Sequence, residues 1–502
     1  MKDFKKLVNV VTKRGQKNIP LLFFNKDVEA IGKEMELYLQ TQSGEFVTDK
    51  DASLGIYGAE VPDHRYKMLK SRVKQKLLNH LFFLDYDDER IPNTHKQEEE
   101  CLRLLHFSKV LINEGEYEVS EKLLNKACYI AEESELTFMK LSSLEMLRRI
   151  HTENCRPIHF KKTNEEIAQI KDLHNIEDKA KETFYYYKIL LSKSGHSRKK
   201  NIDNVETAIA DLKKTYEKYK TYEIFENLYK LEMLYYQLNG DFDQMIRLTQ
   251  EVDKQFESGK INAKRFDERY NKYMKIYAHM KSKDYNNGMK YAEKFSNDFS
   301  KASHTWFSFM EIYFLLAMHT KAYDTATSII SKVILNSFYD KLSNKEKEKW
   351  NIYRGYLYFL SPEDLLLKNY NFEKYFMEIP VFKKDYAGYN AAILILQFLN
   401  YLKEDKVGYL KKPVDELGKY VNKFCVDCFS KRTKAFYKLL NTIVKCGLDI
   451  KSIKIKTKYL STKLKDIDTP GDIYNELEVL PYEQLWDITI KYLKINEVKA
   501  EL

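Results

Sequence analysis

The stretch Leu104-LHFSKVLINEGEYEVSEKLLNKACYIAE-Glu133 contains two apolar helical patterns joined by one short turn. Gly115 supplies the turn, Tyr117 follows two residues later, and Ser120 is a small residue three positions further on. Glycine accepts the backbone angles of a tight turn, and apolar residues at helical spacing flank it on both sides. The stretch therefore predicts two antiparallel helices joined by a tight corner. Their apolar and small positions are Leu104, Phe107, Ser108 and Leu111 on the first helix, and Leu124 and Ala127 on the second.

Three later segments have the same order of turn residue, aromatic residue and helix. They are Gly240-DFDQ-Met245 with Phe242, Lys283-DYNN-Gly288 with Tyr285, and Lys321-AYDT-Ala326 with Tyr323. Counted from Tyr117, the four aromatic residues are 125, 43 and 38 residues apart. The chain therefore repeats one structural unit at irregular spacing.

These corners resemble those of the tetratricopeptide repeat (TPR), a helical hairpin of about 34 residues with a Gly-x-Tyr-x-x-Ala corner. The first unit matches best; Met245 stands where the small residue belongs, and lysine replaces glycine at positions 283 and 321. The motifs cover about 100–130 residues, and the remainder shares only the helical rhythm. The resemblance implies an all-α fold, an irregular TPR-like array of hairpins (an α-solenoid) in which neighbours share a continuous core.

The composition agrees with long helices and with a cytoplasmic protein. Gly (16) and Pro (9) are scarce, and hydrophobic residues make up 44% of the 502 residues, among them 38 tyrosines. Six scattered cysteines favour a reducing compartment. No stretch approaches the roughly 18 apolar residues of a membrane span, so we expect no membrane partner. A net charge of +10 permits acidic partners without demanding them.

Residues 1–90 are predicted to form a small helical domain, followed by the repeat domain at 96–502 with capping helices at its C-terminus. Thr48-DK-Asp51 has the form of a capping box, and Gly58 is a helix stop. Asp63 is the expected N-cap of a third helix that ends near Leu84. The apolar stripe of this helix contains Tyr66, Leu69, Val73, Leu77 and Leu81.

The third helix contains the strongest candidate binding residues. It contains six basic side chains in twelve residues, and no acidic residue interrupts them. A basic helix after a short capped helix resembles a helix-turn-helix, in which such side chains contact DNA phosphates. The alternative is a solvated or protein-contacting face whose basic stems cover the apolar stripe. The six residues are Arg65, Lys67, Lys70, Arg72, Lys74 and Lys76.

Two other segments are rich in lysine. Ser192-KSGHSRKKNIDN is expected to be an exposed loop. Lys451–Lys465 combines an alternation typical of strands with a spacing typical of helices, and the all-α context favours the helix. Both basic patches, 198–200 and 451–465, are interpreted as solvated surface.

Signals of catalysis and of metal binding are weak. The sequence has no phosphate-binding glycine loop, nucleophile elbow or zinc-protease helix. Cys425-VD-Cys428 offers two thiols, half of a zinc site. His151 and Cys155 have ligand spacing on one helix, but Pro157 is expected to break that helix before His159. We therefore predict no catalytic residue, no metal and no cofactor.

The sequence favours a non-enzymatic scaffold or adaptor that binds a protein or peptide on the surface of its helical array. The alternative is a DNA-binding regulator with an N-terminal helix-turn-helix-like module and a TPR-like sensor domain. An enzyme or toxin-associated subunit with a site built from scattered residues is a third possibility. The identity of the partner and the oligomeric state stay open.

Overall fold

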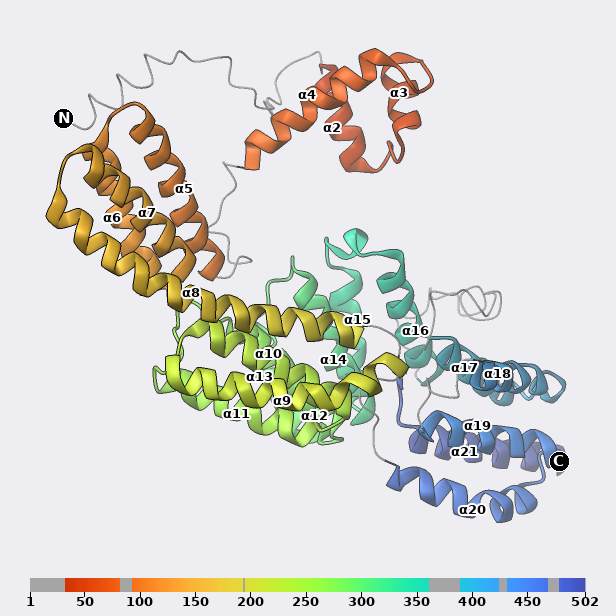
Figure 1. Ribbon diagram of the computed structural model, residues 1–502. Coiled ribbons are helices and arrows are strands. Elements are labelled where there is room, and N and C mark those ends of the chain that lie inside the picture. The colour runs from red at the N-terminus through yellow and green to blue at the C-terminus, as the bar shows by residue number, and fades with distance from the viewer. Residues whose placement is uncertain are drawn as a thin grey trace. The chain divides into compact units, whose positions relative to one another are not determined.

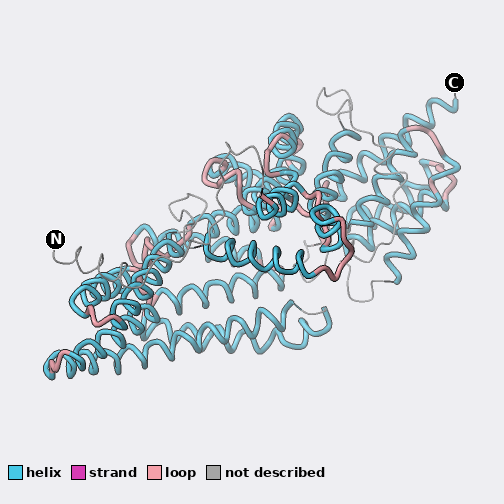
Figure 2. The backbone as a smooth tube through the Cα atoms, turned by 90° about the horizontal axis from the view of Figure 1, so that it is seen from above, coloured by secondary structure: helices cyan, strands magenta, loops and turns pink. Residues whose placement is uncertain are grey.

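The computed structural model describes residues 32–81, 93–192, 195–360, 389–423, 431–467 and 478–501. These residues form α-helices and short 3-10 turns, with no strand among them, which confirms the predicted all-α fold (Figures 1 and 2). The chain divides into two compact units, residues 1–168 and 169–502. Most helices that follow one another in sequence pack as neighbours, as expected of a helical repeat.

The helices of the first unit are α2 (Lys33–Ser43), α3 (Asp49–Tyr57), α4 (His64–His80), α5 (Asn93–Asn113), α6 (Tyr117–Glu133) and α7 (Thr137–Glu153). Helix α8 (Pro157–Ser192) continues into the second unit. The second unit continues with α9 (Gly195–Tyr219), α10 (Tyr222–Asn239), α11 (Phe242–Glu257), α12 (Glu268–Lys281), α13 (Tyr285–Phe295), α14 (His304–His319), α15 (Tyr323–Ile334) and α16 (Asn344–Leu360). Its last helices are α17 (Tyr389–Lys403), α18 (Lys411–Lys423), α19 (Lys431–Lys445), α20 (Ile450–Asp466) and α21 (Tyr482–Glu501).

The caps of α3 and α4 lie at the residues that the sequence indicates, whereas Leu84, the predicted end of α4, lies outside the described residues. Thr48 and Asp51 form a reciprocal capping box, Gly58 ends α3 with a φ of +62°, and the Asp63 carboxylate caps α4. Tyr66, Leu69 and Val73 are buried in the core of this group, as predicted. Leu77 and Leu81 are not; their exposed fractions are 39% and 52% because the core of α2–α4 ends at Val73.

Each of the four corner motifs coincides with a helix junction. Tyr117, Phe242, Tyr285 and Tyr323 are the first residues of α6, α11, α13 and α15. Two residues before each of them the backbone is left-handed, with φ values of +79° to +82° at Gly115 and Gly240 and +62° to +64° at Lys321 and Lys283. The residues three positions after the aromatic lie between the helices. Ser120, Met245 and Ala326 are fully buried, and the Ser120 hydroxyl donates to the carbonyl oxygen of Ser108 at 3.1 Å.

The same turn recurs at junctions that lack the motif. Glu135, Cys155, Lys220 and Asp405 also have positive φ, each two residues before a new helical segment. In three of these turns the next backbone N–H donates to a carbonyl five residues earlier: Leu136 to Ala131 at 2.7 Å, Arg156 to His151 at 2.9 Å and Lys406 to Tyr401 at 2.9 Å. This hydrogen bond closes a Schellman turn, which satisfies the last carbonyls of the helix. The corner is therefore defined by its backbone conformation and hydrogen bond, and many different side chains can occupy it.

Replacing Lys321 by glycine is expected to stabilise the second unit by about 0.5–1 kcal/mol. A left-handed backbone costs an L-residue about 1–2 kcal/mol, and the extra unfolded-state entropy of glycine removes about 0.4–1 kcal/mol of that gain. The control is Lys332→Gly, an exposed lysine with helical backbone in α15, which should instead cost up to about 1 kcal/mol. Urea unfolding followed by circular dichroism measures both, and a destabilised Lys321→Gly would contradict the assignment of strain at this corner.

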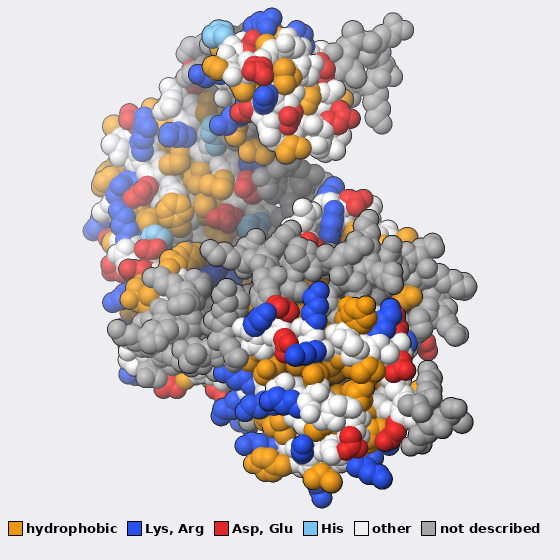
Figure 3. All heavy atoms as spheres, turned by 90° about the vertical axis from the view of Figure 1, so that its right-hand side faces the viewer, with side chains coloured by type: hydrophobic (Ala, Val, Ile, Leu, Met, Phe, Trp, Pro, Cys, Tyr) orange, Lys and Arg blue, Asp and Glu red, His pale blue; other side chains and the backbone are white. Residues whose placement is uncertain are grey.

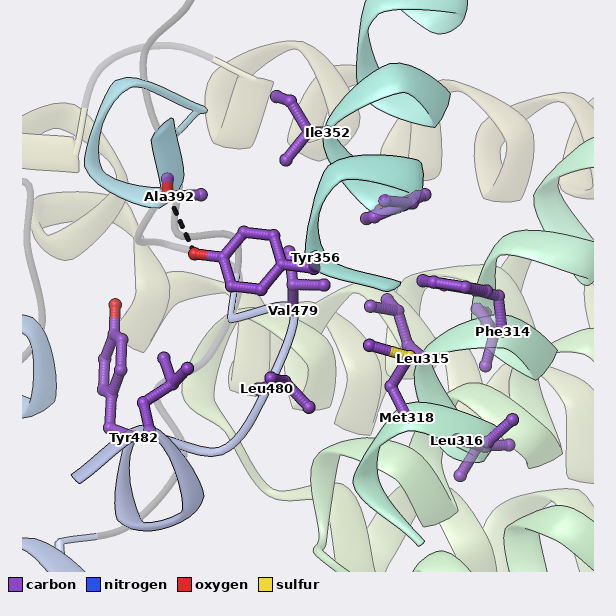
Figure 4. Close-up of a cluster of buried hydrophobic side chains, with 14 of the residues drawn as sticks. Phe314, Leu315, Leu316, Met318, Ile352, Tyr356, Ala392, Val479, Leu480 and Tyr482 are labelled. Atoms are coloured by element: carbon purple, nitrogen blue, oxygen red, sulfur yellow. Dashed lines mark hydrogen bonds between the residues drawn. The ribbon is translucent and has the colours of Figure 1, made fainter. Parts of the chain in front are cut away.

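The core of the second unit surrounds α14. Twelve residues of this helix are buried, on all of its faces. Figure 4 shows Phe314, Leu315, Leu316 and Met318 of α14 near Tyr356 of α16, with Val479 and Leu480 entering from the segment before α21. The Tyr356 hydroxyl donates to the carbonyl oxygen of Ala392 in α17 at 2.8 Å. Helix α14 therefore presents no open face to a ligand.

A buried arginine holds the C-terminal helices together. The Arg432 guanidinium, at the start of α19, contacts Glu478 at 2.7 Å and Glu483 at 2.8 Å. It also donates to the carbonyl oxygens of Leu464 and Ile467, at the end of α20, at 3.0 Å each. The cluster therefore ties α19, α20 and α21 to one cation.

One prediction about α9 is wrong. The expected exposed loop at 192–204 is helical from Gly195 onward, where α9 begins. The Arg and Lys residues at 198–200 are good helix formers, so the helix that is expected after Asn204 extends back through them. In contrast, 451–465 is helical in α20, as the sequence indicated.

Candidate functional site

Four of the six basic side chains on α4 already have acidic partners. Arg65 pairs with its own N-cap Asp63 at 2.9 Å, and Lys70 pairs with Asp49 at 2.6 Å. Arg72 and Lys76 both contact Glu34 of α2, at 3.3 Å and 2.5 Å. The Arg65 hydrogen bond, together with the capped N–H groups, lowers the pKa of Asp63 to about 2. The acidic residues of α2 and α3 therefore offset much of the charge that the sequence shows on α4.

Two basic residues of α4 differ from the rest. Lys67 and Lys74 are exposed and have no ion pair within the described residues. The connection between α3 and α4 runs from Gly58 to Asp63, longer than the three or four residues typical of a helix-turn-helix. DNA binding by α4 stays a prediction, and this geometry adds no support to it.

A groove with a volume of about 1020 Å³ lies between α8 and α9. Its floor lies over the apolar cluster that contains Ala180 and Leu212. Tyr186, 57% exposed, stands at its rim, and the Tyr187 hydroxyl bridges the helices by donating to the carbonyl oxygen of Asn204 at 3.1 Å. The lining residues are Asn175, Ile176, Lys179, Ala180, Glu182, Thr183, Tyr186 and Tyr187 of α8, and Asn204, Thr207, Ala208, Asp211, Leu212, Thr215 and Tyr219 of α9.

The lining residues recur at helical spacing on both walls. On α8 the positions 176, 180, 183 and 187 lie three or four residues apart, and on α9 so do 204, 208, 212, 215 and 219. This spacing places each set along one stripe of its helix, like the facing positions of a coiled coil. The α8 stripe extends over about 18 Å at 1.5 Å per residue. A long groove with tyrosine rims and an apolar floor has the shape of a helix-binding site.

The sequence could not have revealed this groove. Sequence motifs mark residues with special turn chemistry, whereas the groove is built from ordinary residues on two long helices. The one available signal is the exposed aromatic run from Tyr185 to Tyr187, followed by Ile189. Tyr185, Tyr186 and Ile189 are all largely exposed.

The metal-ligand candidates of the sequence come together only in part. Helix α7 ends at Glu153 and α8 starts at Pro157, so the predicted break separates His151 from His159. Their ring centroids are 5.4 Å apart, and burial lowers the pKa of His151 below its ordinary value. Among the described residues, no group of three or more His, Cys, Asp or Glu side chains is arranged to hold a metal ion. Cys425 and Cys428 lie outside the described residues.

Two further findings concern the chain as a whole. None of the described helices is both long enough and apolar enough to cross a lipid bilayer. Comparison with known protein families, with curated proteins and with solved structures finds no match.

Proposed function

We propose that the chain is a non-enzymatic, TPR-like adaptor whose α8–α9 groove binds an amphipathic helical segment of a partner protein. The single observation that carries this proposal is the groove itself, about 1020 Å³ in volume with tyrosines at its rim. Its apolar floor supplies the burial that drives association, and the ring-plus-hydroxyl character of tyrosine suits a surface that is dry on one side and wet on the other.

The spacing of the lining residues favours a helix over an extended peptide. Both walls present side chains three and four residues apart, so a third helix can place its own apolar stripe between them. Lys179 on one wall and Asp211 on the other favour a segment that carries both signs of charge at its edges. Mixed polar and apolar linings are common in reversible interfaces.

A peptide library tests this proposal. The full chain would be panned against a displayed library of amphipathic helical peptides, and the enriched peptides would be measured by fluorescence anisotropy. Tyr186→Ala should weaken the enriched peptides about tenfold or more, because a rim tyrosine is a typical interface hot spot. Tyr129→Ala, which removes an exposed tyrosine of α6, serves as the control and should leave the affinity unchanged.

Two outcomes would overturn the proposal. One is a panning experiment that enriches no peptide over an unrelated helical protein. The other is a set of enriched peptides that bind wild type and Tyr186→Ala equally, which would place their site elsewhere on the chain.

A further inference from the structure

Nearly all of the net charge of the protein resides in one short region. Residues 431–466, which include α19 and α20, contain eleven Lys and Arg against two Asp, a net charge of +9. The whole chain has a net charge of +10. Arg432 is neutralised by the partly buried carboxylates of Glu478 and Glu483. Within the described part of the chain, none of the lysines of this region has an ion pair.

Four lysines face one another across a groove between α20 and α21. The groove has a volume of about 580 Å³. Lys454 and Lys458 line it from α20, and Lys491 and Lys494 line it from α21. All four are exposed, and none has an ion pair within the described residues. The other lining residues are Thr457, Ser461, Trp486, Asp487 and Ile490.

The spacing of these lysines suits a row of anionic groups. On each helix the two lysines are three or four residues apart, so their Cβ atoms lie about 5–6 Å from each other on one face. Asp487 is the one acidic side chain in the lining. The like charges repel one another in the free protein, so a bound polyanion would relieve that repulsion as well as contribute attraction.

The basic residues of α20 differ from those of α4 in that they lack acidic partners among the described residues. On α4, Glu34, Asp49 and Asp63 pair with four of the six basic side chains. On α20, the exposed lysines at 451, 454, 456, 458 and 465 have no such partners in the described part of the chain. In Figure 3, Lys and Arg side chains gather on the lower part of the face, where the C-terminal helices lie, with hydrophobic side chains among them.

Two exposed side chains on α20 narrow the class of polyanion. Tyr459 is 74% exposed and Ile455 is 78% exposed. Each follows a groove lysine in the sequence, and both lie outside the groove lining, on the solvent-facing side of α20. The Lys463 ammonium lies 5.6 Å from the centre of the Tyr459 ring, which keeps the ring close to positive charge. Aromatic rings interleaved with lysines are typical of proteins that bind single-stranded nucleic acid, because bases stack on the rings while the lysines contact phosphates.

The other polyanions fit this surface less well. A groove of about 580 Å³ cannot enclose a duplex, whose phosphates lie on a broad convex surface. The exposed apolar residues of α20, Ile455 and Tyr459, share one helical face with the polar Ser452 and Thr462, so the helix has no continuous apolar face to enter a membrane. An acidic peptide would satisfy the lysines but would leave Tyr459 without a base to stack on.

We propose that the α20–α21 groove binds the backbone of single-stranded nucleic acid, with Lys454, Lys458, Lys491 and Lys494 as the phosphate-contacting residues and Tyr459 as a stacking platform. This site is separate from the α8–α9 groove, so either proposal can fail without the other.

Fluorescence anisotropy of the full chain with labelled 20-nucleotide oligo(U) and oligo(dT) tests the proposal. Four phosphate contacts predict a slope of about −2.8 in the logarithm of the association constant against the logarithm of salt concentration, or about 50-fold weaker binding at 200 mM than at 50 mM. The double variant Lys454→Glu/Lys458→Glu should lose about tenfold or more of the affinity. Tyr459→Ala should lose about fivefold or more, because one base loses its stacking partner.

A matched control separates this site from net charge. Lys290→Glu/Lys294→Glu makes the same change of charge at the same spacing on α13, where both lysines are exposed, and should leave the affinity unchanged. Circular dichroism of each variant verifies that the helices are intact. Equal loss in the two double variants would overturn the proposal, as would the absence of oligonucleotide binding.

Three competing ligands complete the experiment. If a duplex of the same length binds as tightly as the single strands, the groove does not select single-stranded nucleic acid and the proposal is wrong. Polyglutamate or phosphatidylserine vesicles that bind while the oligonucleotides do not would assign the lysines to an acidic protein or to a membrane. Preference between oligo(U) and oligo(dT) would show whether RNA or DNA is the source of the strand.

Discussion

Arg432→Met is expected to lower the free energy of unfolding of the second unit by about 3–5 kcal/mol, because it leaves two carboxylates without their cation. The Arg432 side chain is 2% exposed, and those of Glu478 and Glu483 are about one-fifth exposed. Methionine keeps most of the volume of arginine. The loss of unfolding free energy therefore comes from the unpaired carboxylates and from the carbonyl groups of Leu464 and Ile467, which lose their hydrogen-bond donor. Urea unfolding at neutral pH measures it.

The same variant is expected to change the pH dependence of stability. Burial alone would raise the pKa of Glu483, but its hydrogen bond and ion pair with Arg432 lower that pKa below the ordinary value of 4.5. A lowered folded-state pKa contributes stability above pH 4.5, and this contribution disappears as the pH falls through the folded-state value. The difference between wild type and Arg432→Met should therefore be largest near neutral pH and shrink in acid.

Two further variants control this prediction. Lys431→Met removes the exposed neighbouring charge at the start of α19 and should change stability by no more than about 0.5 kcal/mol. Arg432→Met combined with Glu478→Gln and Glu483→Gln should recover part of the loss, because no charge is then left unpaired. An Arg432→Met variant as stable as Lys431→Met would show that the cluster contributes no net stability.

Trp350→Ala is expected to cost about 3–5 kcal/mol, the range for truncating a large aromatic side chain in a packed core. Trp350 of α16 is 2% exposed, and its ring centroid lies 5.4 Å from that of Tyr353 and 6.2 Å from that of Phe314 on α14. The cavity would lie between α14 and α16, so hydrogen exchange should quicken in these two helices first. Trp350→Phe, which keeps an aromatic ring, should cost clearly less. Equal losses for the two variants would contradict the packing described here.

The sequence predicted the helices well because their signals are local. Thr48, Asp51, Gly58 and Asp63 act on residues within one helical turn, and each appears in the structure at its expected cap. The corners at Glu135 and Cys155 were missed because neither a glycine nor an aromatic residue marks them. Their left-handed backbone is imposed by the Schellman hydrogen bonds and by the packing of the helices on either side.

The electrostatics of the two basic helices could not be predicted from their own residues. The partners of Arg72 and Lys76 come from Glu34, about forty positions earlier in the chain. The groove lysines Lys491 and Lys494 meet α20 only after α21 folds against it. In both cases the contact that matters is tertiary. The sequence makes α4 the stronger candidate binding surface, but the ion pairs of the structure favour the α20–α21 groove instead.

Glu478, which pairs with Arg432, also joins the C-terminal helices to the middle of the second unit, and this contact affects how the unit folds. In an ordinary helical array each repeat contacts only its neighbours, so structure can start at any hairpin and spread along the chain. Here the His319 imidazole, at the end of α14, donates to the carbonyl oxygen of Glu478, 159 residues away. Gln484 of α21 donates to the His319 carbonyl oxygen in return. Closing such a long loop slows folding, and it makes the middle of the array and its last helix gain or lose structure together.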